Sequence, residues 1–193
     1  MKVAIIKYNA GNIRSVDFAL KRLGVDASIT DDHDLIRSSD KVIFPGVGEA
    51  STTMQYLRDK GLDVLIGSLR QPVLGICLGL QLMCAGSEEG SAKCIGIFDL
   101  GIRKFEPKLK VPHMGWNSLE EIQGGLISNE LNGKYAYFVH SYYAPLSEYT
   151  SAVTHYINPF SAALERDNFY ATQFHPEKSG SVGETILKNF LML

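Results

Sequence analysis

The feature that most constrains the fold is a regular alternation of strand-like and helix-like segments in the first half of the chain. Short apolar runs typical of buried strands lie at 2–8, 25–30, 41–44 and 72–76. Helical patterns separate them, at 13–23 (closed by Gly24), 49–60 and 62–69. Strands that alternate with helices in this way favour a mainly parallel sheet covered by helices on both faces.

The second half of the chain has a different pattern. Strand-like runs separated by turn residues lie at 99–105, 116–122, 134–140, 150–156, 161–167 and 169–174, before a final helix at 182–191. We expect these runs to add antiparallel or mixed strands to the central sheet. The predicted fold class is therefore α/β, with a mixed, mainly parallel central sheet flanked by helices, additional antiparallel strands in the C-terminal half, and one domain over 1–193.

Composition excludes several classes of protein. A formal net charge of −2 and 45% apolar residues give no sign of a polyanion-binding surface or a disordered tail. The chain lacks a run of ~18 apolar residues, and its first residues lack a signal-peptide core, so we expect a cytoplasmic protein that binds neither membrane nor nucleic acid. Three cysteines without close pairs predict reduced thiols, with Cys84 buried on the same helical pattern that follows Cys77.

One cysteine stands at the corner between a predicted strand and a predicted helix. The sequence Gly75-Ile-Cys77-Leu-Gly79 is a G-x-C-x-G version of the nucleophile elbow, in which glycines relieve crowding around a strained turn. Amides in the first turn of the helix favour the thiolate, and the N–H of Leu78 is placed to donate to an oxyanion. The pentapeptide is equally compatible with an ordinary core cysteine between packing glycines, so the decision depends on a base.

The candidate base is His175, which follows an apolar strand in FYATQFHPEKSG. In an extended segment residues i and i+2 point to one side, so His175 and Glu177 can face the same neighbour. Pro176 restricts the backbone between them. An exposed acid in a turn would be the ordinary interpretation of His-Pro-Glu alone, but together with the elbow it predicts a Cys77–His175–Glu177 triad.

Other motifs add to this hypothesis. The glycines of PGVG (45–48) allow close approach to a ligand, so an amide of Val47 or Gly48 could be the second oxyanion donor, although alone the motif is a tight turn. Among the remaining histidines, His33 is expected in a solvated turn capping a short helix and His155 at a half-exposed strand position. His113 and His140 are candidates for ligand contacts.

These motifs, in this order, resemble the class I (triad-type) glutamine amidotransferase family. The resemblance covers essentially the whole chain and rests on YNAGN (8–12), PGVG (45–48), CLGLQ (77–81), PHMGWN (112–117), YFVHSYY (137–143) and FHPEKS (174–179). It implies a flavodoxin-like fold and glutamine hydrolysis through a cysteine thioester, without cofactor or metal. Family glutamine contacts correspond to Gln81, Glu89, His140, Ser141 and Tyr142. From the residues alone, Gln81 could face solvent, and Ser141 and Tyr142 could be ordinary strand-end residues.

Two stretches depart from the family pattern or have no counterpart in it. Ala10 stands where some relatives have proline, so the first loop is expected to be more flexible here. The segment KFEPKLK (104–110) has no assigned counterpart and is interpreted as a solvated face.

The resemblance also implies a partner. It suggests a heterodimer with a separate (β/α)8 cyclase subunit of histidine biosynthesis that receives the ammonia, with Asn12, Trp116, Tyr137 and Lys178 at the docking face. Three alternatives stay open: a paralogue that supplies another synthase, such as one amidating a surface sugar; a cysteine peptidase or other hydrolase of the same architecture; and a non-catalytic subunit.

Overall fold

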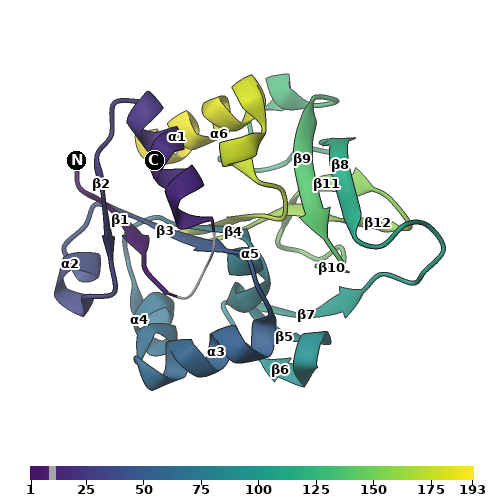
Figure 1. Ribbon diagram of the computed structural model, residues 1–193. Helices are drawn as coiled ribbons and strands as arrows, with labels where there is room; N and C mark the ends of the chain where they lie inside the picture. Colours follow the sequence, from purple (N-terminus) through teal and green to yellow (C-terminus); the bar gives the residue numbers. More distant parts are fainter. Residues whose placement is uncertain (9–11) are drawn as a thin grey trace.

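The computed structural model describes residues 1–8 and 12–193 and contains a central seven-stranded sheet in the order β11–β12–β13–β4–β3–β1–β2 (Figure 1). Neighbouring strands from β13 to β2 are parallel, whereas β12 and β11 run antiparallel at one edge. The bounds are β1 Val3–Ile6, β2 Ala27–Thr30, β3 Lys41–Gly46, β4 Val73–Cys77, β11 Thr150–His155, β12 Pro159–Arg166 and β13 Phe169–Thr172. The structure confirms the predicted α/β class and its mainly parallel sheet.

Helices cover both faces of this sheet (Figure 1). One layer contains α1 (Ile13–Arg22) and α6 (Gly180–Met192); the other contains α2 (His33–Arg37), α3 (Ala50–Asp59), α4 (Leu62–Ser68) and the short α5 (Leu78–Met83). Alternate residues of β1 supply the two cores: Ala4 and Ile6 pack on the α3–α5 side, and Val3 and Ile5 on the α1–α6 side. All four are buried, as expected for a strand with helices on both faces.

Several strands of the second half do not join the central sheet, so that part of the expectation is wrong. A four-stranded sheet contains β5 (Cys84–Ser87), β6 (Ala92–Lys93), β7 (Phe98–Lys104) and β10 (Tyr142–Tyr143), and β8 (His113–Ser118) pairs with β9 (Tyr135–His140) alone. The helix after Cys77 ends at Met83, and Cys84 adopts an extended backbone that begins β5. Cys84 is therefore a buried free thiol, as predicted, but it lies on a strand.

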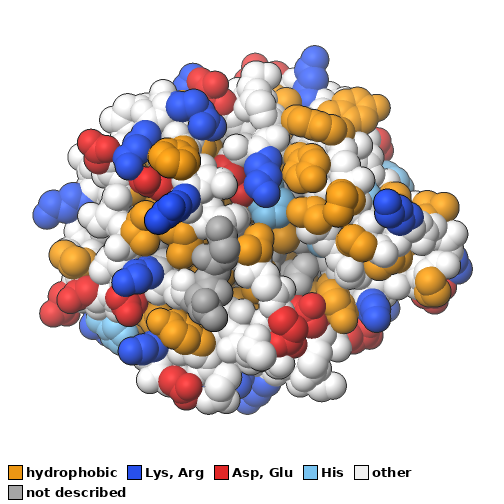
Figure 2. Space-filling model, in the orientation of Figure 1, with side chains coloured by type: hydrophobic (Ala, Val, Ile, Leu, Met, Phe, Trp, Pro, Cys, Tyr) orange, Lys and Arg blue, Asp and Glu red, His pale blue; other side chains and the backbone are white. Residues whose placement is uncertain are grey.

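The two-stranded ribbon β8–β9 has two distinct faces. Its inward pairs are His113 with His140 and Gly115 with Phe138, and its outward pairs are Met114 with Val139 and Trp116 with Tyr137. Figure 2 shows hydrophobic side chains grouped over this part of the molecule, at the upper right of the view. Met114 and Trp116 are 58% and 56% exposed, so the outer face is apolar and uncovered.

Three further observations complete the fold. None of the helices in residues 1–8 and 12–193 is long and apolar enough to cross a membrane. His33 begins α2, whose N-cap is Asp32, in agreement with the predicted capping turn.

The 104–110 segment contains one buried residue. Phe105 is buried and stacks on Tyr143 at 4.5 Å between ring centroids, while the other six residues are exposed as expected. A solvated face is therefore the wrong description for Phe105.

Candidate active site

The turn between β4 and α5 places Cys77 in a strained backbone conformation, with φ +54° and ψ −104°. An L residue rarely adopts a positive φ, and such strain is concentrated at functional sites. A Cβ atom on Gly79 would lie 2.0 Å from the carbonyl oxygen of Phe44, and one on Gly75 would lie 2.8 Å from the sulfur of Met83. The two glycines are therefore required for the corner, as the spacing predicts.

A buried His–Glu pair lies beside this cysteine. The Nδ1 of His175 is 2.8 Å from Oε1 of Glu177, and both side chains are fully buried. Burial alone would lower the pKa of His175, but its interactions with Cys77 and with Glu177 outweigh burial and raise the pKa above its usual range. The imidazolium is thus favoured next to the sulfur. With Nδ1 occupied by Glu177, Nε2 has no hydrogen-bond partner within the described part of the chain.

The backbone that brings His175 and Glu177 together differs from the predicted extended segment. Strand β13 ends at Thr172, and His175 is extended, but Glu177 lies in a 3₁₀ turn, η3 (Pro176–Lys178). The premise of one extended segment is therefore wrong. A tight turn started by Pro176 folds the carboxylate back onto the ring.

A cavity of about 290 Å³ opens beside Cys77. All of the residues predicted for the oxyanion and for glutamine line it, together with Pro112 and Val139: Val47, Gly48, Leu78, Gln81, Glu89, His140, Ser141 and Tyr142. They come from four separate segments, namely the loop after β3, the start of α5, η1 (Glu89–Ser91) and the junction of β9 with β10. The volume is near the lower end of the range for small-molecule sites, roughly 300–1,000 Å³, which suits a ligand the size of one amino acid.

A chain of hydrogen bonds fixes one wall of the cavity. Nδ1 of His140 donates to the carbonyl of Tyr142 at 2.7 Å, and Nε2 of His140 accepts from Nδ1 of His113 at 3.1 Å. Burial lowers the pKa of His140 to about 3 and that of His113 to about 4, so both rings are neutral at pH 7. Gln81 is 4% exposed and donates to the same Tyr142 carbonyl at 3.1 Å. The alternative in which Gln81 faces solvent is wrong.

The acidic residue of the cavity is Glu89, which is half-buried in η1. Its Oε2 accepts from the backbone N–H of Ala50 at 2.8 Å, at the start of α3. Burial raises the pKa of this carboxyl, whereas the Ala50 hydrogen bond lowers it. The remaining oxygen can receive a cationic group. Over residues 1–8 and 12–193, no three His, Cys, Asp or Glu side chains are grouped in a way that could hold a metal ion.

The residues from Ala4 to the C-terminus match the family model "Glutamine amidotransferase class-I", over 4–193. The chain belongs to this amidotransferase family. The chain is thus a glutamine amidotransferase, as the resemblance of its motifs implies.

Similar proteins and structures agree with this assignment. The amidotransferase is 63% identical to the "Imidazole glycerol phosphate synthase subunit HisH" of Bacteroides fragilis (strain YCH46), with both chains fully covered. It is 44% identical to the protein of that name from Shewanella loihica, over 98% of this chain and 89% of that one.

Solved structures share the fold. One titled "Crystal structure of glutamine amidotransferase" has a TM-score of 0.74 at 18% identity, covering 98% of this chain and 97% of that one. A putative GMP synthase subunit from Thermoplasma acidophilum has a TM-score of 0.73 at 20% identity, covering 100% of this chain and 92% of that one.

The four docking residues predicted for this amidotransferase differ in accessibility. Trp116 and Lys178 are exposed, Tyr137 is half-buried, and the rings of Trp116 and Tyr137 meet edge-on at 6.0 Å. Asn12 is only 5% exposed, because its Nδ2 donates to Oε1 of Glu177 at 3.1 Å. Its side chain therefore supports the candidate triad acid from within the protein. The prediction about Ala10 lies outside the described residues.

Sequence reasoning missed several groups around the amidotransferase site. The side-chain amide of Gln173 donates to the sulfur of Cys77 at 3.7 Å, and its Oε1 accepts from Nε2 of Gln81 at 3.1 Å. The contact between Asn12 and Glu177 joins segments 165 residues apart. A polar Gln173 inside a predicted apolar strand is a sequence signal for its contacts with Cys77 and Gln81. Nothing in the local sequence indicates the contact between Asn12 and Glu177.

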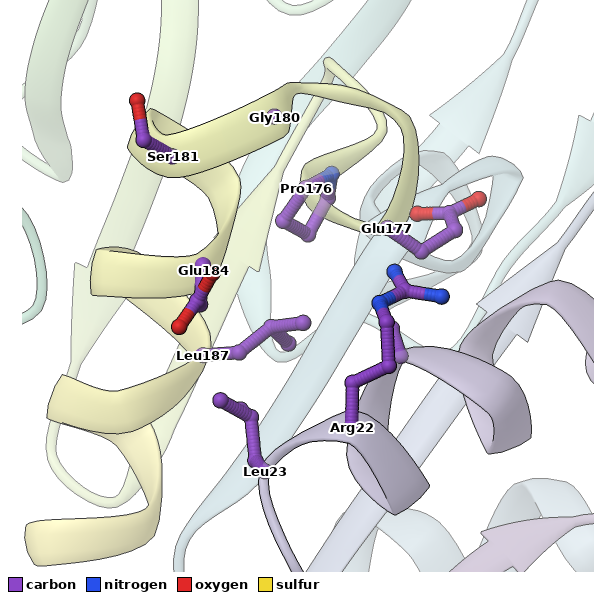
Figure 3. Close-up of a pocket in the computed structure, with 9 residues that line it drawn as sticks. Arg22, Leu23, Pro176, Glu177, Gly180, Ser181, Glu184 and Leu187 are labelled. Carbon is purple, nitrogen blue, oxygen red and sulfur yellow. The ribbon is translucent and has the colours of Figure 1, made fainter.

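A second cavity of about 280 Å³ lies between α1 and α6 and was not predicted. It is lined by Ala19, Arg22, Leu23, Pro176, Glu177, Gly180, Ser181, Glu184 and Leu187. Figure 3 shows Arg22 projecting from α1 and Glu184 from α6 at this cavity, and the guanidinium contributes to the lowered pKa of Glu184, after the hydrogen bond and charge of Lys188. Glu177 borders this space, whereas Cys77 borders the other cavity.

Proposed function

We propose that this chain is the glutaminase subunit of imidazole glycerol phosphate synthase, acting in a cytoplasmic heterodimer with a cyclase subunit. It hydrolyses L-glutamine to glutamate and ammonia and delivers the ammonia to the cyclase, which forms imidazole glycerol phosphate and AICAR. The observation that carries the proposal is the cavity at Cys77, where the nucleophile, the candidate amides and five candidate substrate contacts line one space. The relatives named HisH favour this partner over a surface-sugar synthase.

The first half of the reaction uses Cys77 and His175. The thiolate attacks the side-chain amide carbon of glutamine, and the carbonyl electrons move to oxygen. The N–H of Leu78 and that of Val47 or Gly48 stabilise this oxyanion. His175, held as an imidazolium by Glu177, gives its Nε2 proton to the departing nitrogen, so the carbon–nitrogen bond breaks and ammonia leaves a glutamyl thioester on Cys77.

The second half hydrolyses the thioester. The now neutral His175 takes a proton from water, which attacks the thioester carbon, and the same amides stabilise the second oxyanion. Collapse expels the thiolate and releases glutamate, and the imidazolium–thiolate pair is restored. Glu177 orients the ring in both halves and exchanges no proton with substrate.

The rest of the cavity selects glutamine. We assign the α-ammonium of the substrate to Glu89, whose second oxygen is free of the Ala50 hydrogen bond. Gln81 and His140 both donate to the Tyr142 carbonyl, so they hold the wall on which Ser141 and Tyr142 contact the substrate. Because both side chains are neutral and already hydrogen-bonded, they contribute shape and dipoles.

The docking face for the cyclase is assigned to the outer face of β8–β9 and to Lys178. Trp116 and Tyr137 provide aromatic surface of the kind that dominates binding energy at interfaces. Lys178 follows Glu177 directly, and its backbone N–H donates to the His175 carbonyl at 3.0 Å. An ion pair from its exposed ammonium to the partner would therefore act on the segment that carries the triad base.

This coupling supplies a way to restrain glutamine hydrolysis. Gly48 has φ +132°, a conformation that L side chains rarely adopt, so the peptide that precedes it can rotate. We propose that the PGVG amide turns toward the oxyanion when the cyclase binds its own nucleotide ligand.

Co-purification with the cyclase, followed by glutaminase assays with and without the cyclase ligand, tests the proposal. We expect slow hydrolysis by the isolated chain and strong activation by partner plus ligand. Trp116→Ala should weaken association, and Leu109→Ala, at a comparably exposed apolar residue outside the ribbon, is the matched control. Full-rate hydrolysis by the chain alone, unchanged by both additions, contradicts the regulatory part; absence of glutaminase activity in the complex contradicts the function.

A further inference from the structure

The tyrosine that lies just beyond β1 contacts the loop that carries two candidate oxyanion amides. Tyr8 is 5% exposed, and its hydroxyl donates to the carbonyl of Pro45, the first residue of PGVG. Its ring packs against Phe44, with 5.6 Å between centroids and 53° between planes. Tyr8 was assigned only as part of the YNAGN motif, and the reaction described above gives it no role.

The Tyr8 hydroxyl also lies at the place where the PGVG segment meets the nucleophile elbow. A Cβ atom built on Gly46 would be 2.6 Å from the Tyr8 oxygen, 2.7 Å from Cβ of Leu78 and 2.8 Å from N of Gly79. Gly46 is also the register partner of Cys77 across β3 and β4. The missing side chain of Gly46 thus leaves the space in which these three groups converge.

We infer that Tyr8 is a positioning residue that fixes the distance between the two backbone segments supplying the oxyanion amides. Leu78 belongs to one segment, and Val47 and Gly48 belong to the other. Both amides must lie about 2.7–3.1 Å from the developing oxyanion, and a displacement near ~1 Å can cost ~100-fold in rate. The inference rests on the oxyanion roles given under the proposed function.

The state of the hydroxyl agrees with this role. Burial, and secondarily the nearby Cys77, raise the pKa of Tyr8 far above its usual range, so the group remains a protonated donor at any pH used for assay. Tyr8 does not reach the reacting atoms in this role; it holds the carbonyl that precedes the amides.

A purely structural hydroxyl would behave differently when removed. Loss of one buried hydrogen bond would lower the melting temperature but leave the stabilisation of the tetrahedral intermediate intact. A positioning role and a purely structural role can therefore be distinguished by comparing a ligand that forms an oxyanion with one that does not. The Cys77 thiolate adds to the aldehyde carbon of glutamate γ-semialdehyde, and the resulting oxyanion lies at the amides. Glutamate does not undergo this addition.

The test compares Tyr8→Phe with wild type, both bound to the cyclase and its ligand. We expect kcat for glutamine hydrolysis to fall roughly 10- to 100-fold with KM within about threefold, and affinity for the semialdehyde to fall by a similar factor while glutamate affinity stays constant. Alkylation of Cys77 by iodoacetamide should keep its rate, because the thiolate–imidazolium pair is intact. Tyr170→Phe, at a half-buried tyrosine of β13 whose hydroxyl bonds to no described residue, should change none of these values.

Unchanged kcat and semialdehyde affinity in Tyr8→Phe would overturn the inference, whatever the melting temperature. A fall in the alkylation rate equal to the fall in kcat would also overturn it, because the lesion would then lie at the nucleophile. If Tyr8→Phe does not fold, 4-fluorophenylalanine at position 8 fills the space of the hydroxyl without donating to Pro45, and an unchanged kcat and semialdehyde affinity would then contradict the role. An inactive wild-type complex would instead contradict the proposed function.

Discussion

Two cavities of nearly equal size each border a different member of the candidate triad, and they differ in what surrounds them. The cavity at Cys77, about 290 Å³, is lined by a cysteine with a strained backbone, the PGVG segment, the polar side chains of Gln81 and His140, and the carboxyl group of Glu89. The cavity between α1 and α6, about 280 Å³, is lined by apolar side chains and by exposed charges such as Arg22 and Glu184. Glu177 lines the second cavity, and Cys77, at the other end of the candidate triad, lines the first.

The comparison teaches that volume does not identify the active site. The groups at the first cavity are restrained: Cys77 by a positive φ, His140 by two hydrogen bonds and Gln81 by two donated hydrogen bonds. At the second cavity Glu184 pairs with Lys188 one helical turn away, an arrangement typical of a solvated helix surface. Pre-organisation of polar groups, rather than empty space, separates the two.

The largest expected effect comes from removing the nucleophile. Cys77→Ala or Cys77→Ser should reduce glutamine hydrolysis by about 10⁴-fold or more, because no other described group in the cavity can form the thioester. Folding and partner binding should persist, since the replacements remove or exchange a single atom. Steady-state glutaminase assays and circular dichroism measure both. Retained hydrolysis by Cys77→Ala would show that the triad assignment is wrong.

His175→Asn should be nearly as damaging. The ring moves the proton in both halves of the reaction, so we expect a loss on the order of 10³- to 10⁴-fold. The double variant with Cys77→Ala should be no less active than Cys77→Ala alone, since the two groups act as a unit and their losses do not add. A fully active His175→Asn enzyme would direct attention to His140 or His113.

Glu177→Gln should lower activity less, roughly 10²-fold, and should move the titration of His175. Loss of the carboxylate lowers the pKa of that ring, which stays above its usual range in wild type. Because the folded-state pKa is raised, the stability supplied by this ring is complete below its unfolded pKa of about 6.5 and is lost as pH rises through the raised value. Histidine ¹⁵N shifts and unfolding experiments between pH 6 and pH 10 should show a smaller alkaline loss in Glu177→Gln; an identical titration midpoint would contradict the pairing.

The smallest effect is expected from Glu184→Gln, the same chemical change at the same second cavity. Glu184 is exposed and pairs with Lys188 at 2.7 Å, so its loss should leave kcat and KM within about a factor of two of wild type. Comparing it with Glu177→Gln isolates the role of the triad acid from any role of the cavity. A large fall in activity in Glu184→Gln would mean that the second cavity takes part in the reaction.

Much of the fold could be predicted because its signals are local. Three of the parallel strands of the first half, β1, β3 and β4, are short buried runs, and β2 is a partly exposed edge strand. The corner at Cys77 is marked by two glycines that the packing of Phe44 and Met83 requires. Strand partners in the second half depend on contacts between distant segments, so the pairing of β8 with β9 away from the central sheet was not predictable from periodicity. The helix after Cys77 was expected to continue through Cys84, but tertiary pairing of β5 with β7 outweighs that pattern.

The candidate site likewise combines residues that local motifs predict with contacts that depend on distant segments. Cys77, His175 and Glu177 lie in motifs whose residue types already suggest the chemistry. The extended geometry inferred for Glu177 was wrong, because residues 176–178 turn after an X-Pro step, and the contact of Asn12 with that carboxylate crosses 165 residues. Burial of Gln81 likewise depends on Gln173 and Tyr142, which no local pattern places next to it.

The two-faced ribbon limits how this chain can tolerate insertions. Side chains of a strand alternate with a period of two, so adding or deleting one residue within 113–118 or 135–140 would exchange the faces. Trp116 would then replace Gly115 or Asn117 at an inward position, and His113 or His140 would leave the wall beside Tyr142. A single-residue length change here would therefore damage the proposed substrate wall and the proposed docking face together, whereas a two-residue change would preserve the alternation. Length variants of this ribbon should survive selection in steps of two.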